Sequence, residues 1–119
     1  MASSIKRLHT GARMSEAVIA NGFVFLAGQV SDDDTLDITG QTQRVLASID
    51  RLLADAGTDK SRLLSAQIFL VDLADFAAMN AVWEKWVSPG NTPTRATVQA
   101  NLARPGWKVE IVVTAVLPD

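Results

Sequence analysis

The feature that most constrains the fold is the last apolar segment, Trp107–Leu117, whose alternating pattern predicts a long β-strand. One side of this strand is wholly apolar and carries Val109, Ile111, Val113, Ala115 and Leu117. On the other side, Val112 and Val116 stand among Lys108, Glu110 and Thr114. A strand with apolar residues on both sides needs cover on both faces of its sheet. The number of helices available to provide that cover therefore decides the architecture.

The sequence predicts two helices. The first runs from about Gly40 to Gly57, where the glycine takes the position that commonly follows a helix. Asp72 is a plausible N-cap for the second, which ends at the helix-breaking stretch 88–91. The expected buried stripe of the first helix comprises Val45, Leu46, Ile49, Leu52, Leu53 and Ala56. The second carries Leu73, Phe76, Met79 or Asn80, Trp83, and Trp86 or Val87 at helical spacing.

The remaining apolar segments predict strands. Asn21-Gly22 is a strong two-residue hairpin turn, so 15–20 and 23–27 should pair. Residues 60–71 and 94–100 predict two more strands, and a short first strand is expected around 5–8. In the 60–71 strand we expect one face to carry Leu64, Ala66, Ile68 and Leu70.

These elements predict an α+β fold in the order β-β-β-α-β-α-β-β, with both helices packed on one face of the sheet. The 119 residues fit a single domain spanning 1–119. Since two helices cover only one face, a second copy of the chain is the simplest cover for the other. We therefore predict a homo-oligomer.

Composition excludes several classes of site and partner. The formal net charge is −2 and the basic residues are scattered, so neither nucleic acid nor a charged membrane surface is an expected partner. The chain has no cysteine and one histidine, His9, which excludes thiolate chemistry and a Cys- or multi-His-ligated metal. Residues 1–8 lack the apolar run of a secretion signal, and no window is apolar enough to span a bilayer. We expect a cytoplasmic protein without a metal or cofactor.

Arg95 is the most informative polar residue. In the expected strand 94–100, Arg95, Thr97 and Gln99 point one way, and small or apolar residues point the other. The planar guanidinium suits recognition of a carboxylate by paired hydrogen bonds. A structural ion pair, or a simply exposed arginine on an edge strand, is the alternative interpretation.

Glu110 is the second candidate because it interrupts an otherwise apolar strand. In an apolar setting its carboxylate could hold and release a proton during catalysis. The alternative is an ion pair with Lys108 of a neighbouring subunit or with Arg95 itself.

Six segments, in this order and spacing, resemble the RidA or YjgF-type family of reactive-intermediate deaminases. They are 13–17 (RMSEA), 21–30 (NGFVFLAGQV), 41–42 (QT), 75–80 (DFAAMN), 93–98 (PTRATV) and 109–116 (VEIVVTAV). The likeness spans nearly the whole chain, although no single segment is decisive.

The resemblance implies a chorismate-mutase-like fold assembled as a homotrimer, with an active site between adjacent subunits. It also implies hydrolysis of 2-imino acids, or of enamines such as 2-aminoacrylate, to 2-keto acids and ammonia. The family's substrate-binding arginine falls on Arg95 and its acidic residue on Glu110. Gly28 and Asn80 match two further cleft positions. The reaction needs no cofactor because an iminium carbon is already a good electrophile.

Two positions depart from the family pattern. Met14 stands where members often carry a tyrosine, and Thr97 stands where they often carry a cysteine. Thr97 keeps a hydroxyl near Arg95, whereas Met14 cannot donate a hydrogen bond. Either change could alter substrate preference or rate. Two rivals stay open: a non-catalytic trimer that binds a 2-keto or amino acid, and an RNA-acting role, against which the net charge argues.

Overall fold

The first three strands form an antiparallel meander. The computed structural model describes residues 4–119, and its first strands are Lys6–Thr10 (β1), Ser15–Ala20 (β2) and Phe23–Leu26 (β3). Asn21 and Gly22 both have positive φ angles, 53° and 80°, as a tight hairpin turn of the expected kind requires. The predicted hairpin is therefore confirmed.

Both expected helices are present. Helix α1 spans Ile38–Ala56, begins at Asp37, whose side chain accepts from the Gly40 amide, and ends at Gly57 with φ 92°. The predicted C-terminal glycine is confirmed, and the helix begins two residues earlier than expected. Asp72 caps a short 3-10 turn, Leu73–Asp75, which leads into α2 at Phe76–Trp86.

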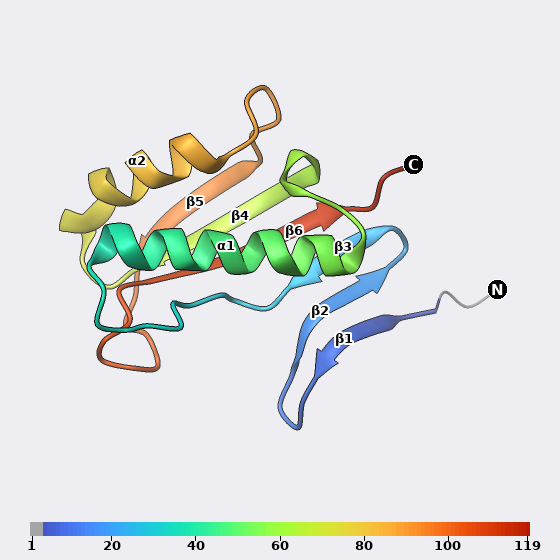
Figure 1. Ribbon diagram of the computed structural model, residues 1–119, viewed down its shortest axis with the longest axis horizontal. Coiled ribbons are helices and arrows are strands. Elements are labelled where there is room, and N and C mark those ends of the chain that lie inside the picture. Colours follow the sequence, from blue (N-terminus) through green and yellow to red (C-terminus); the bar gives the residue numbers. More distant parts are fainter. Residues whose placement is uncertain (1–3) are drawn as a thin grey trace.

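Strands β4 (Leu63–Leu70), β5 (Thr94–Gln99) and β6 (Val109–Val116) complete one six-stranded sheet. The spatial order is β1-β2-β3-β6-β4-β5, so β6 lies inside the sheet and β5 at one edge. Strand β5 runs parallel to β4, and the other neighbours are antiparallel. Both helices lie on the same face, with α1 across the middle of the sheet and α2 beside β5 (Figure 1). The predicted element order and layering are confirmed.

Alternation along the strands divides the sheet into a covered and an uncovered face. On β6, Val109, Ile111, Val113 and Ala115 are buried beneath the helices. The intervening residues point to the face that has no helices. Large apolar side chains exposed there include Phe23, Phe25 and Val98, at 43%, 48% and 47%. Half of the sheet's side chains therefore lack cover within one chain.

The predicted buried face of β4 is confirmed for Ala66, Ile68 and Leu70 but wrong for Leu64. The register between β4 and β6 shifts between Leu63 and Ser65, which is a β-bulge. Leu63 therefore joins Ala66 and Ile68 on the buried face, whereas Leu64 is turned outward and exposed. A bulge shifts the alternation of side chains by one residue. Assigning every second residue to one face across a bulge therefore places the residues before it on the wrong face.

Gln41 connects two loops at the start of α1. Its buried amide nitrogen donates to the carbonyls of Leu36 and Gly106, at 3.0 and 2.9 Å. Its amide oxygen accepts from the Lys108 backbone N–H at 2.9 Å. One side chain thus holds the loop that enters α1 against the loop that enters β6. Among residues 4–119, no helix is long and apolar enough to cross a membrane.

Replacing Gln41 with leucine should lower stability without changing the fold. The free energy of unfolding should fall by about 3 kcal/mol, since each buried polar group left unpaired costs about 1–3 kcal/mol. Urea denaturation measures this change, with Gln43→Leu as control because Gln43 lies exposed on the same helix. Equal effects of the two substitutions would contradict the role assigned to Gln41.

Candidate functional site

The Arg95 side chain lies on the covered face of the sheet, against α2. Arg95 lies opposite Ala66 in the pairing of β5 with β4, and opposite residues point to the same face of a sheet. Because Ala66 is buried under the helices, Arg95 also points to the helix side. The guanidinium carbon lies 5.5 Å from the centre of the Trp83 ring and 6.0 Å from that of Phe76. These distances permit cation–π attraction at both rings. Arg95 is nevertheless exposed and forms no ion pair within residues 4–119. Its charge is positioned but not neutralised.

Asn80 and Thr97 place two more polar groups at this junction of α2 and β5. Asn80 shares a helix face with Phe76 and Trp83, and Thr97 lies two residues beyond Arg95 on the same side of β5. Asn80 Oδ1 and Thr97 Oγ1 are both shielded from solvent and have no hydrogen-bond partner within the described chain. Buried polar atoms without partners are rare in folded proteins. Both atoms therefore have hydrogen-bonding capacity that the described chain does not use.

Glu110 lies on the other face, where Gly28 allows its close approach. The backbone groups of Gln29 and Ile111 form two hydrogen bonds with each other. This pairing places the neighbouring Gly28 beside the Glu110 side chain. A Cβ at position 28 would lie 2.1 Å from Glu110 Oε2 and 2.9 Å from its Cδ. Only glycine leaves room for the carboxylate in this position. Glu110 pairs with neither Lys108 nor Arg95 within residues 4–119.

A second carboxylate lies near this glycine and was not predicted as part of the site. The buried Gln29 amide donates to Glu16 Oε2 at 3.0 Å and to the Ala27 carbonyl at 2.9 Å. Both Glu16 and Gln29 fall in segments that carry the family resemblance. No spacing rule could have linked them, because their contact depends on how β2 and β3 pair.

Within one chain, Arg95 and Glu110 are too far apart to act on one small molecule. The two residues lie on strands that flank β4 and are offset by three positions in register. Strand spacing and rise place their Cα atoms about 14 Å apart. The side chains also leave opposite faces of the sheet. The structure therefore divides the predicted site into an arginine group (Asn80, Arg95, Thr97) and a glutamate group (Gly28, Glu110).

Met14 belongs to neither group. It is exposed in the turn between β1 and β2, which is closed by a hydrogen bond from Gly11 N to the Met14 carbonyl. With His9, Arg13 and Glu16 it lines a hollow of about 480 Å³. This turn lies toward the β1 edge of the sheet, at the end opposite β5. His9 is exposed and its ring forms a hydrogen bond with Asp55 of α1.

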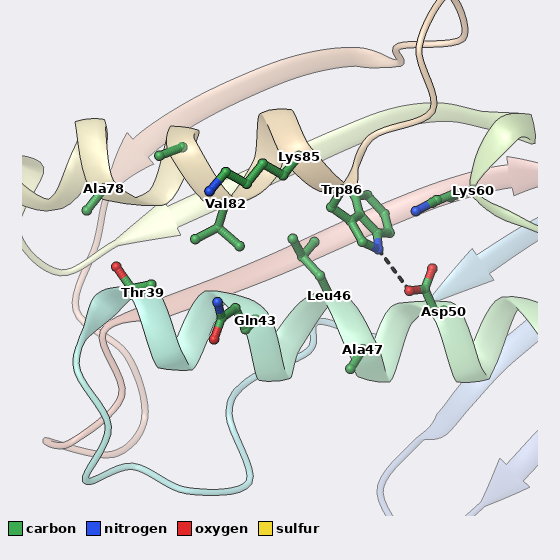
Figure 2. A pocket seen from close by; sticks show the side chains of 11 residues that line it. Thr39, Gln43, Leu46, Ala47, Asp50, Lys60, Ala78, Val82, Lys85 and Trp86 are labelled. Carbon is green, nitrogen blue, oxygen red and sulfur yellow. Dashed lines mark hydrogen bonds between the residues drawn. The ribbon is translucent and has the colours of Figure 1, made fainter.

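A further cavity lies elsewhere. It measures about 510 Å³ and lies between α1 and α2, and none of the predicted site residues lines it (Figure 2).

Within residues 4–119, no group of three or more acidic or histidine side chains is arranged to hold a metal ion. Hydrogen bonds from Thr35 and Ser61 hold the pKa values of Asp33 and Asp59 below their usual range. Each aspartate accepts these hydrogen bonds from a residue two positions further along the chain and so stabilises a local turn.

Comparison with known proteins gives consistent matches over the whole fold. The family described as Endoribonuclease L-PSP matches residues 4–117. A RutC family protein from Haemophilus ducreyi is 49% identical over 113 residues, covering 95% of this chain and 97% of the relative. A solved YjgF family structure from Neisseria meningitidis has 51% identity and a TM-score of 0.95, covering 98% and 97%. A Rid family structure from Yersinia pestis has 28% identity and a TM-score of 0.88, covering 96% and 100%.

The chain belongs to this L-PSP, RutC and YjgF family. The resemblance predicted from the sequence is thereby confirmed, and so is the α+β fold. The names of family members differ in the activity that they suggest. The chemistry of this chain therefore depends on its own residues.

The close approach of Gly28 and Glu110 predicts a specific coupling. Gly28→Ala should lower the free energy of unfolding by about 1–3 kcal/mol, because the Glu110 side chain must move or be compressed. The same substitution made in a Glu110→Ala background should cost much less. Thermal or urea denaturation of wild type, the two single variants and the double variant measures the coupling between the two positions. Gly11→Ala is the matched control, since its nearest contact is an ordinary 3.7 Å. Additive effects would contradict this packing.

Proposed function

We propose that the protein hydrolyses 2-imino acids, or enamines such as 2-aminoacrylate, to 2-keto acids and ammonia. The observation that carries the proposal is the Arg95 guanidinium, which lies 5.5 and 6.0 Å from the centres of two aromatic rings yet is exposed and has no ion-pair partner within the described chain. Such a guanidinium can bind a carboxylate through paired hydrogen bonds. Membership of a family that includes Rid proteins agrees with this chemistry.

The active site is a cleft between two copies, with Arg95 from one chain and Glu110 from the next. This arrangement follows if both residues act on one molecule, because a single chain holds them on opposite faces. The uncovered sheet face supports the assembly, since Phe23, Phe25 and Val98 would be buried against neighbouring copies. The assembly is a homotrimer, as the family resemblance implies, and its closed symmetry repeats the same cleft three times.

In the reaction, Arg95 binds the substrate carboxylate and orients the adjacent imine carbon. Glu110 accepts a proton from water as the water oxygen bonds to that carbon, and then gives this proton to the imine nitrogen, forming the carbinolamine. The carbinolamine hydroxyl proton is next transferred through Glu110 to the amino nitrogen, the C–N bond breaks as the C=O bond forms, and ammonia departs, giving the 2-keto acid. Atoms balance with one water consumed, and no cofactor takes part.

The remaining residues position these groups. Asn80 Oδ1 and Thr97 Oγ1 are unpaired beside Arg95, so they can accept hydrogen bonds from the substrate nitrogen or from a bound water. Gly28 leaves space for the Glu110 carboxylate. Met14 presents an exposed apolar side chain to the cleft from the turn between β1 and β2. An apolar group at this position favours substrates with apolar side chains over polar ones.

The alternative function is non-catalytic binding of a 2-keto or amino acid at the same cleft. Arg95 would bind the ligand carboxylate in either function. Glu110 of the next chain, as a proton acceptor in the same cleft, favours catalysis over binding alone. An endoribonuclease role, which the family description names, has weaker support in this chain. The net charge is −2, and the basic residues are scattered along the sequence rather than gathered in a stretch that would follow a phosphate backbone.

The assembly is tested by charging the uncovered face. Phe25→Asp should convert the trimer to monomers that keep their secondary structure, because Phe25 points away from the core. Light scattering gives the mass and circular dichroism the fold. Ala54→Asp, an exposed position on α1, is the control and should remain trimeric. A wild-type protein that is monomeric at micromolar concentration would rule out the two-chain cleft.

The reaction is tested with a freshly generated imino acid. Turnover is the excess of keto-acid formation over the protein-free rate, because imines also hydrolyse without a catalyst. Glu110→Gln should reduce kcat by about 10²–10⁴-fold, as expected for loss of a general acid–base group. Arg95→Ala should reduce kcat/KM by about 10²-fold or more through loss of orientation.

Two controls separate catalysis from binding and from folding. Arg51→Ala removes an exposed arginine on α1 and should leave turnover unchanged. Arg95→Ala should lower the Tm by only a few degrees, since it loses contacts with the Trp83 and Phe76 rings but leaves no buried ion-pair partner within the described chain. If no imino acid gives excess turnover but a 2-keto acid raises the Tm of wild type alone, the protein is the non-catalytic binder.

A further inference from the structure

The groove between α1 and α2 has the features of a second ligand site. Its apolar lining consists mainly of small or branched side chains: Leu46, Ala47, Ala78, Ala81 and Val82. Because the alanine side chains are small, they leave a hollow of about 510 Å³ between the two helices, a volume typical of small-molecule sites. The groove lies on the helix side of the molecule, away from the sheet face that the proposed trimer buries (Figures 1 and 2).

One end of the groove is closed by a bridge between the helices. Trp86 Nε1 of α2 donates to Asp50 Oδ2 of α1 at 2.9 Å, as the dashed line in Figure 2 marks. Lys60 lies above the same indole, with its Nζ 5.2 Å from the ring centre. A closed end limits the length of a ligand. It therefore fits a small molecule better than a helix or peptide passing through.

The charges around the groove favour an anion. Two lysines, Lys60 and Lys85, line it, and neither forms an ion pair within residues 4–119. The one carboxylate in the lining, that of Asp50, is engaged by Trp86. Figure 2 shows the Lys60 ammonium at the Trp86 end and the Lys85 ammonium toward Val82. The groove is therefore locally positive in a chain whose net charge is −2.

From these features we infer that the groove between α1 and α2 binds a small aromatic carboxylate. Its ring would pack on the alanines, Val82 and the Trp86 indole, and its carboxylate would lie beside Lys60 or Lys85. This site is independent of the proposed deaminase cleft, because it contains neither Arg95 nor Glu110.

Calorimetry with 2-naphthoate tests the site, and 2-naphthamide is the uncharged probe of the same shape. We expect saturable binding of one naphthoate per chain and much weaker binding of the amide. In NMR spectra of the full-length protein, the methyl signals of Ala47, Ala78 and Ala81 should shift with the same affinity. Equal binding of the two probes, or the absence of saturable binding, would overturn the inference.

Substitutions then locate the probe. Lys60→Gln together with Lys85→Gln should weaken Kd for naphthoate about tenfold, since the double substitution removes the charge beside the carboxylate whichever of the two lysines it contacts. Lys6→Gln, an exposed lysine on β1, is the control. Ala47→Leu with Ala81→Leu should fill the groove and abolish binding, whereas Ala54→Leu, elsewhere on α1, should not. The substituted side chains are all exposed or half-buried, so folding should be retained.

Two further variants distinguish the groove from the deaminase cleft and from an interface between copies. Arg95→Ala should leave naphthoate binding unchanged, and binding that disappears in this variant would place the probe in the deaminase cleft instead. If Ala47→Leu with Ala81→Leu changes the molecular mass of the assembly but not the affinity for naphthoate, the groove is a contact between copies and the inference is wrong. Imine turnover should be the same in all groove variants.

Discussion

Two helices cannot cover both faces of a six-stranded sheet, and the rest of this structure follows from that limit. Helices α1 and α2 bury the residues of β6 that lie beneath them and leave the alternate ones open. Alternation then assigns each polar residue to a face. Arg95 shares the covered face with Ala66, whereas Glu110 lies on the open one. The shortage of helical cover thus both favours association and separates the two principal candidates for catalysis.

Local packing sets the position of each group more finely. Gln41 holds the loops before α1 and β6 together through backbone carbonyls and the Lys108 N–H, just ahead of Glu110. Gly28 provides the space that the Glu110 side chain occupies. On the other face, Trp83 and Phe76 hold the Arg95 guanidinium without neutralising it. Rigid surroundings around an unpaired charge are what orientation of a small substrate requires.

The sequence predicts most of the fold because its strongest signals are local. The Asn21-Gly22 turn, the stripe of α1 and its terminal Gly57 each depend on neighbouring residues only. Leu64 was placed on the wrong face because a bulge depends on how β4 pairs with β6, which is a non-local property.

The sequence names candidate residues for the site but not their layout. Alternation in 94–100 groups Arg95 with Thr97, yet only the register with β4 reveals which face they share. Phe76 and Trp83 were predicted as members of a helical stripe, and Trp83 is indeed buried. Their contact with Arg95 depends on where α2 packs. The contact between Glu16 and Gln29 likewise requires the pairing of β2 with β3.

The most direct test of a site built from two chains is complementation between inactive variants. Arg95→Ala and Glu110→Gln proteins are mixed in equal amounts, dissociated, reassembled and assayed for imine hydrolysis. If each cleft takes Arg95 from one chain and Glu110 from another, random assembly restores about a quarter of wild-type turnover, because half of the chains supply each intact residue. Turnover that remains at the level of the separate variants, in verified mixed trimers, would contradict the two-chain site.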